Sequence, residues 1–215
     1  MSIRILLADD HTIVREGLKG MLEREPDMKV IADVGDGRTA VKMALQEKPD
    51  VVVMDISMPD LNGIEATSQI IAELKKIKVI CLSMHREKKF VGAMLRAGAS
   101  GYVIKNDVTR ELIGAIRKVM SGDMYLSPAI AGDVVNQFVR GRSTQAKGAF
   151  TELSEREREV LQLIAEGLST KEIAPKLGVS EKTVAAHREH IMEKLGLHNV
   201  VELTRYALRE GISQL

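Results

Sequence analysis

The sequence has few of the features that mark exported or membrane-bound proteins. Its 215 residues include one cysteine and no tryptophan, and the formal net charge is only +1. No apolar stretch approaches the length of a transmembrane span, and the amino terminus lacks a signal peptide. Cys81 lies inside an apolar run, which favours a small core residue over a reactive thiol. We therefore expect a cytoplasmic protein with no membrane partner.

What the sequence does contain, in its first half, is a series of short apolar runs separated by stretches of helical spacing. The runs predict five strands, at residues 3–8, 28–34, 51–54, 79–82 and 102–104. Because most runs are continuously apolar rather than alternating, the strands should be covered on both faces, as in a parallel sheet. The hydrophobic content of 45% in a chain of this length is enough for two small domains, of which this α/β unit is the first.

Polar residues close four of these runs: Asp9 with Asp10, then Asp55, Ser83 and Lys105. In open α/β sheets, ligands bind outside the carboxyl ends of the strands, so the fold would bring these residues together. Crowded carboxylates suit Mg²⁺, and a carboxylate can also become an aspartyl-phosphate. A single residue could have a simpler role, such as Asp10 capping the helix after it or Lys105 lying on the surface. Their occurrence at successive strand ends favours a phosphoryl site.

The runs LLADDH, VVVMDISMPDLNG, ICLSMH and GASGYVIK resemble the receiver domain of two-component response regulators over residues 1–122. The resemblance implies a flavodoxin-like sheet of five parallel strands in the order 2-1-3-4-5. It also implies that Asp55 is the phosphoacceptor. The implied Mg²⁺ ligands are Asp10 directly, Asp9 through water, Asp55 and the Ser57 carbonyl. The implied switch residues are Ser83, where the family often has threonine, Tyr102 and Lys105.

The resemblance further implies how phosphorylation is communicated. A phosphoryl group adds roughly one and a half to two negative charges and three acceptor oxygens. Ser83 can move toward these oxygens and leave space that Tyr102 fills. This movement would reshape the face formed by the fourth helix, the fifth strand and the fifth helix.

The helical and strand periodicity lapses after about residue 122. We predict a partly helical linker over 123–149, in which Pro128 opens a helix and residues 140–149 are flexible. The apolar positions of that helix, which need a packing partner, are Ile130, Val134, Val135 and Phe138.

Residues 150–215 predict a small all-helical domain with clear helix starts. Ser154 with Glu157 and Ser169 with Glu172 form two capping-box patterns, each before a periodic apolar run. Ser180 can cap a third helix, and a glycine-containing turn separates this helix from the second one. The second and third helices therefore form a helix-turn-helix. Pro175 should bend or shorten the first helix of that pair.

The run LSEREREVLQLIAEGLSTKEIAPKLGVSEKTVAAHREHIMEKLGLHN resembles the LuxR-type DNA-binding domain, and its position after a receiver matches the NarL/FixJ class. The resemblance implies that residues 181–195 form the recognition helix, which enters the major groove of double-stranded DNA. The candidate DNA-contacting residues are Lys182, Thr183, Ala185, Ala186, His187, Arg188, Glu189 and Lys194.

The charge of this domain departs from the usual DNA-binding pattern. Positions equivalent to Ala185 and Glu189 are often basic in relatives, and residues 151–215 hold nine Lys and Arg against eleven Asp and Glu. The domain therefore lacks the basic footprint of nucleic-acid binding. Arg188 could form an ion pair with Glu157 instead of a DNA contact. His187 and His190 have a spacing seen in metal sites, but no third ligand is evident.

Together these observations predict a transcription regulator rather than an enzyme. A partner histidine kinase would phosphorylate Asp55, and the phosphorylated protein would bind DNA as a homodimer. The candidate dimer surfaces are the first and fifth receiver helices and the last helix. Two other functions stay open. One is a phosphatase, although the absence of a visible substrate-pocket motif argues against it. The other is an adaptor whose acidic second domain binds a protein.

Overall fold

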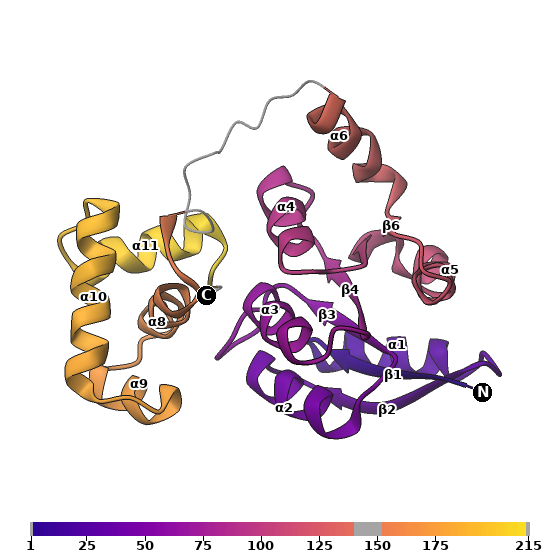
Figure 1. Ribbon diagram of the computed structural model, residues 1–215, viewed down its shortest axis with the longest axis horizontal. Coiled ribbons are helices and arrows are strands. Elements are labelled where there is room, and N and C mark those ends of the chain that lie inside the picture. The colour runs from indigo at the N-terminus through magenta and orange to yellow at the C-terminus, as the bar shows by residue number, and fades with distance from the viewer. Residues whose placement is uncertain (1, 140–151, 214–215) are drawn as a thin grey trace. The chain divides into compact units, whose positions relative to one another are not determined.

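The computed structural model describes residues 2–139 and 152–213 of the chain. The chain divides into two compact units, one formed mainly by residues before 145 and the other mainly by residues from 145 onward (Figure 1). In the described residues, no helix is long and apolar enough to cross a membrane. The predicted flexible linker at 140–149 lies outside the described residues.

The first unit is a parallel sheet with helices on both sides (Figure 1). Its strands are β1 (Ile3–Ala8), β2 (Met28–Val34), β3 (Val51–Asp55), β4 (Lys78–Ser83), β5 (Gly101–Ile104) and β6 (Tyr125–Leu126). Its helices are α1 (Thr12–Leu22), α2 (Gly37–Glu47), α3 (Gly63–Glu73), α4 (Lys88–Arg96), the 3₁₀ helix η1 (Lys105–Asp107), α5 (Val108–Met120) and α6 (Pro128–Val139).

The strand order is β2-β1-β3-β4-β5-β6, which confirms the predicted flavodoxin-like order and adds one strand. Residues 125–126 were predicted to belong to the linker, but Tyr125 pairs with Gly101 and Leu126 with Tyr102 in a parallel ladder. Two residues are too few to show strand periodicity, so only the pairing with β5 identifies β6.

The alternation of strand side chains divides the core between the two faces of the sheet. Ile5 and Leu7 of β1 pack in one cluster with Leu18 of α1 and Ile116 of α5. Leu6, between the two, is also fully buried and so must be covered on the opposite face. Each such aliphatic side chain contributes about 1.5–3 kcal/mol when it is removed from water. Burial on both faces fixes the strand register, and with it the place where each strand ends.

Among the described residues, the second unit contains the helices α8 (Glu155–Ala165), α9 (Thr170–Leu177), α10 (Glu181–Leu195) and α11 (Val200–Glu210). Both predicted capping boxes are present, at Ser154 and at Ser169. The hydroxyl of Ser180 accepts the Thr183 backbone N–H at the start of α10. Helix α9 contains Pro175 and ends two residues after it at Leu177, with the left-handed Gly178 as its C-cap. The core side chains of the unit include Val160, Leu161, Ile164, Ile173, Leu177, Val184, Ile191 and Leu203.

Candidate functional site

Three acidic side chains and one lysine meet at the carboxyl edge of the sheet, where the strand order reverses. Asp9 and Asp10 follow β1, Asp55 ends β3, and Lys105 follows β5. The register places Met54 beside Ala8, so the ends of β1 and β3 lie next to each other. The predicted convergence at the strand ends is therefore present in the fold.

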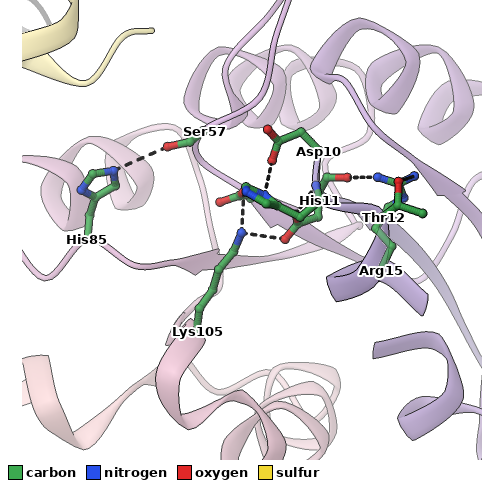
Figure 2. Close-up of polar contacts among 9 residues, drawn as sticks. Asp10, His11, Thr12, Arg15, Ser57, His85 and Lys105 are labelled. Carbon is green, nitrogen blue, oxygen red and sulfur yellow. Dashed lines mark hydrogen bonds and ion pairs between the residues drawn. The ribbon is translucent and has the colours of Figure 1, made fainter. Parts of the chain in front are cut away.

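Lys105 forms two short ion pairs at this edge (Figure 2). Its Nζ lies 2.6 Å from Oδ2 of Asp55 and 2.7 Å from Oδ2 of Asp9. All three side chains are largely buried, Asp55 with only 3% of its side chain exposed and Lys105 with 12%. The lysine is thus a fixed positive charge between two carboxylates, not a surface lysine at a strand end.

The environment of Asp55 disfavours its ionised form. Burial is the main cause and Asp9 adds to it, while Lys105 opposes both, and the pKa of Asp55 is raised to about 6. Burial also lowers the pKa of Lys105, but the attraction and hydrogen bonds of Asp55 and Asp9 outweigh burial and raise it. At neutral pH the site consequently holds a carboxylate whose ionised form is disfavoured by burial, beside an ammonium group.

The acidic cluster has the composition of a divalent-cation site. One ligand atom from each of Asp9, Asp10, His11 and Asp55 can be chosen so that all lie within 4.8 Å of one another. Carboxylate oxygens at this density suit Mg²⁺, which also keeps water ligands. His11 was not among the predicted site residues. Its Nδ1 lies 2.6 Å from Oδ1 of Asp10, and its place directly after the Asp-Asp pair was the available signal (Figure 2).

Asp10 does not serve as the cap of α1. The cap residue is His11, which makes no side-chain cap hydrogen bond, and its backbone N–H donates to Oδ1 of Asp9 at 2.9 Å. Arg15, one turn into α1, donates from Nη1 to the Asp9 carbonyl oxygen at 2.5 Å and holds this corner from behind. Arg15 was also absent from the prediction, because a cation inside a helix gives no local sign of which carbonyl it reaches.

The close approach of α3 to β3 depends on a glycine. A Cβ placed on Gly63 would lie 1.8 Å from the carbonyl oxygen of Asp55, far inside van der Waals contact. The Gly63 backbone N–H donates to the Ile56 carbonyl at 2.8 Å. Only glycine therefore allows the start of α3 to pack against the strand end that presents Asp55.

The other predicted switch residues are joined through the backbone of His85. The His85 N–H donates to the Ser83 hydroxyl at 3.0 Å, and the buried Tyr102 hydroxyl donates to the His85 carbonyl at 2.8 Å. The His85 ring stacks on Phe90, and its Nε2 lies 3.5 Å from the Ser57 hydroxyl (Figure 2). Ser83 and Tyr102 thus hold the same turn between β4 and α4, which sequence spacing did not reveal.

In the second unit, most candidate DNA-contacting residues lie on the exposed side of α10. Lys182, Thr183, Ala186 and Glu189 are exposed, and Ala185, His187 and Arg188 are partly buried. Val184 and Ile191 of the same helix are buried in the core of the unit, which fixes the rotation of α10.

Lys194 has a structural partner. Its Nζ lies 2.8 Å and 2.7 Å from the two carboxylate oxygens of Glu157, which also belongs to the capping box of α8. The ion pair with Glu157 that was considered for Arg188 is formed by Lys194 instead. Burial alone would raise the pKa of Glu157, but the hydrogen bonds from Lys194 and Ser154 outweigh burial and lower it. Any contact of Lys194 with DNA would have to compete with this pair.

Comparisons with known proteins agree over both units. The family described as response regulator receiver domain matches residues 5–117, and the family described as bacterial regulatory proteins of the luxR family matches residues 151–207. The oxygen regulatory protein NreC of Staphylococcus carnosus is 42% identical over 214 residues, which covers 98% of this chain and 99% of that protein.

Solved structures of response regulators are similar as well. The RcsB response regulator of Salmonella typhimurium is 27% identical, with a TM-score of 0.64 and coverage of 95% of this chain and 96% of that one. A structure of an RcsB–DNA complex is also 27% identical, with a TM-score of 0.59 and coverage of 96% and 98%.

Proposed function

This chain belongs to the response regulators that combine a receiver with a LuxR-family DNA-binding domain, and we propose that phosphorylation of Asp55 controls its binding to DNA. The observation that carries the proposal is the pair of short contacts from Lys105 to Asp55 and Asp9 within a buried acidic cluster. A buried carboxylate with a raised pKa, beside a fixed cation, is the environment expected of a reactive aspartate.

In the proposed reaction, one oxygen of Asp55 attacks the phosphorus atom of a phosphodonor. A phosphorus–oxygen bond to Asp55 forms, the bond from phosphorus to the donor atom breaks, and the leaving group keeps that electron pair. Lys105 offsets negative charge on the phosphoryl oxygens, because its ammonium already lies 2.6 Å from Asp55. The donor is a phosphohistidine of a partner histidine kinase.

A divalent cation fits the same cluster, and Mg²⁺ is the cation we propose. Asp10 and Asp55 would bind it directly, Asp9 through water, and the Ser57 carbonyl would complete the protein ligands. The bound ion would supply positive charge that lowers the repulsion between the carboxylates and the incoming phosphate.

The contacts of His85 support a route from Asp55 to the surface. When the Ser83 hydroxyl turns toward a phosphoryl oxygen, it gives up its present bond to the His85 N–H. The backbone of His85, in the turn between β4 and α4, then loses its hydrogen bond to Ser83 and keeps the one from the Tyr102 hydroxyl. The face formed by α4, β5 and α5 changes as a result.

The output of this switch is the binding of DNA by the second unit and the control of transcription, as its family indicates. The exposed side of α10, from Lys182 to Glu189, would enter the major groove, and two copies of the chain would bind paired half-sites. Val200 and Val201 at the start of α11 are 46% and 59% exposed, which supports the last helix as a dimer surface.

The phosphorylation step is tested by mass spectrometry of the full-length protein. Incubation with acetyl phosphate and Mg²⁺ should add one phosphoryl mass to the wild type and none to Asp55→Asn. Uptake of phosphate by Asp55→Asn would show that the phosphoacceptor is misassigned. Turnover of small phosphate esters by the wild type would instead favour a phosphatase.

One observation favours a second function for the DNA-binding half. Residues 151–215 carry a net charge of minus two, which also suits a domain that binds a protein. A gel shift with the phosphorylated protein separates the two functions, since an adaptor would bind no DNA at any salt concentration.

A further inference from the structure

Ser127 is a fully buried serine at the corner between β6 and α6, and its contacts join three elements of the receiver. Its backbone N–H donates to the Tyr102 carbonyl at 2.9 Å. Its hydroxyl oxygen accepts the Ile104 backbone N–H at 3.0 Å and donates its proton to Glu111 of α5. A hydroxyl has one proton and two lone pairs, so these two bonds use it as a donor and as an acceptor at once.

The strand that Ser127 holds is the one that presents the lysine of the phosphoryl site. Ile104 is the last residue of β5 and directly precedes Lys105, whose ammonium contacts Asp55. Tyr102, whose carbonyl accepts the other bond, donates its hydroxyl to His85. A displacement of Lys105 toward a phosphoryl group would therefore move the Ile104 backbone N–H. This movement would change the hydrogen bond from that N–H to the Ser127 hydroxyl.

The same residue sets the start of α6. The backbone N–H groups of Ile130 and Ala131 donate to the Ser127 carbonyl at 2.9 and 3.1 Å. Ile130, in the first turn, is buried with 1% of its surface exposed. Among the described elements, α6 is the last one before residues 151–207, which match the LuxR family.

We propose that Ser127 is a positioning residue that couples the Lys105 end of β5 to α6, with Glu111 holding its hydroxyl in place. The proposal rests on the phosphorylation of Asp55 described above. It adds an output path on β6 and α6 to the one that runs through Ser83 and Tyr102.

The test compares hydrogen exchange in full-length wild type, Ser127→Ala and Ser121→Ala, each with and without acetyl phosphate and Mg²⁺. Ser121 is a matched control because its exposed hydroxyl only donates to the Lys118 carbonyl at the end of α5. In the wild type and in Ser121→Ala, phosphorylation is expected to change the exchange of the α6 amides. In Ser127→Ala that change should be lost, although the phosphoryl mass on Asp55 is still measured.

Without phosphorylation, Ser127→Ala should exchange the Ile104 and α6 amides about fivefold faster, the factor that corresponds to one net hydrogen bond of about 1 kcal/mol. Glu111→Gln keeps the hydroxyl and changes its acceptor, a group that also interacts with Tyr125 of β6, so it should weaken the same coupling partly. It also provides the test if Ser127→Ala does not fold. A purely structural role of Ser127 would raise the basal exchange and leave the phosphorylation-dependent change intact.

The outcomes separate this proposal from the proposed function. If Ser127→Ala and Glu111→Gln both keep the full phosphorylation-dependent change in α6, the coupling through Ser127 is wrong and the phosphoacceptor assignment stands. The same holds if the phosphorylated wild type shows no change in α6. If the wild type takes up no phosphoryl group, both proposals fail.

Discussion

Replacement of Asp55 by asparagine should stabilise the receiver at neutral pH, even though it removes the reactive group. Only 3% of the Asp55 surface is exposed to solvent, and its pKa is raised from 3.8 to about 6. One pKa unit corresponds to about 1.4 kcal/mol, so ionised Asp55 lowers the free energy of unfolding by about 3 kcal/mol. Asparagine has nearly the same shape and no charge, and it relieves this cost.

The sign follows from proton binding. Between pH 4 and 6 the folded protein holds a proton on Asp55 that the unfolded chain has already released. The contribution of Asp55 to stability is therefore present below about pH 4 and is lost as the pH rises through 6. Relative to the wild type, Asp55→Asn should gain about 2 kcal/mol on going from pH 4 to pH 7, whatever the difference at pH 4, because the carboxyl group of the unfolded chain is already partly ionised at pH 4.

The free energy of unfolding in urea is measured through the hydrogen exchange of the β1 and β3 amides, which reports on the receiver alone. Chelator is present, because a bound cation would stabilise the ionised wild type. Asp123→Asn, at an exposed aspartate after α5, is the matched control and should follow the wild type at both pH values. If the difference in free energy of unfolding between Asp55→Asn and wild type were the same at pH 4 and pH 7, burial would not disfavour the ionised form of Asp55.

Two further predictions concern the cation and the DNA. Asp10→Ala should lose Mg²⁺-dependent phosphorylation with an unchanged circular-dichroism melt, because Asp10 does not cap α1; a lowered melting temperature would point to a structural role. Ala185→Lys and Glu189→Lys should each tighten DNA binding and steepen the dependence of log affinity on log salt by about one unit, as for one added phosphate contact. If the wild type binds DNA and neither substitution changes the slope in a salt titration, the DNA-reading face of α10 is misplaced.

The sequence by itself determined the carboxyl ends of five strands to within one residue and the helix starts that are marked by capping boxes. Continuous apolar runs such as Val51 to Met54 are typical of strands covered on both faces, and this one places Asp55 at the sheet edge. The capping boxes at Ser154 and Ser169 are complete within four residues of sequence, and both are present. These features are local, because the groups that satisfy each backbone donor are close in the chain.

The tertiary structure decided the pairings between distant residues. Lys194 rather than Arg188 reaches Glu157, because the rotation of α10 is set by the burial of Val184 and Ile191. Rotation of a helix by one position changes which side chain meets its neighbour, and no local pattern fixes it that closely.

The same reason explains two further features of the receiver that the sequence did not disclose. His85 connects Ser83 to Tyr102 through its backbone groups, which are the same in every residue and leave no mark in the sequence. Strand β6 has only two residues, so its identity comes from the backbone groups of β5 and from Ser127 behind it. Periodicity determines which segments become strands and helices, whereas contacts made by backbone atoms and single side chains exist only once the chain has folded.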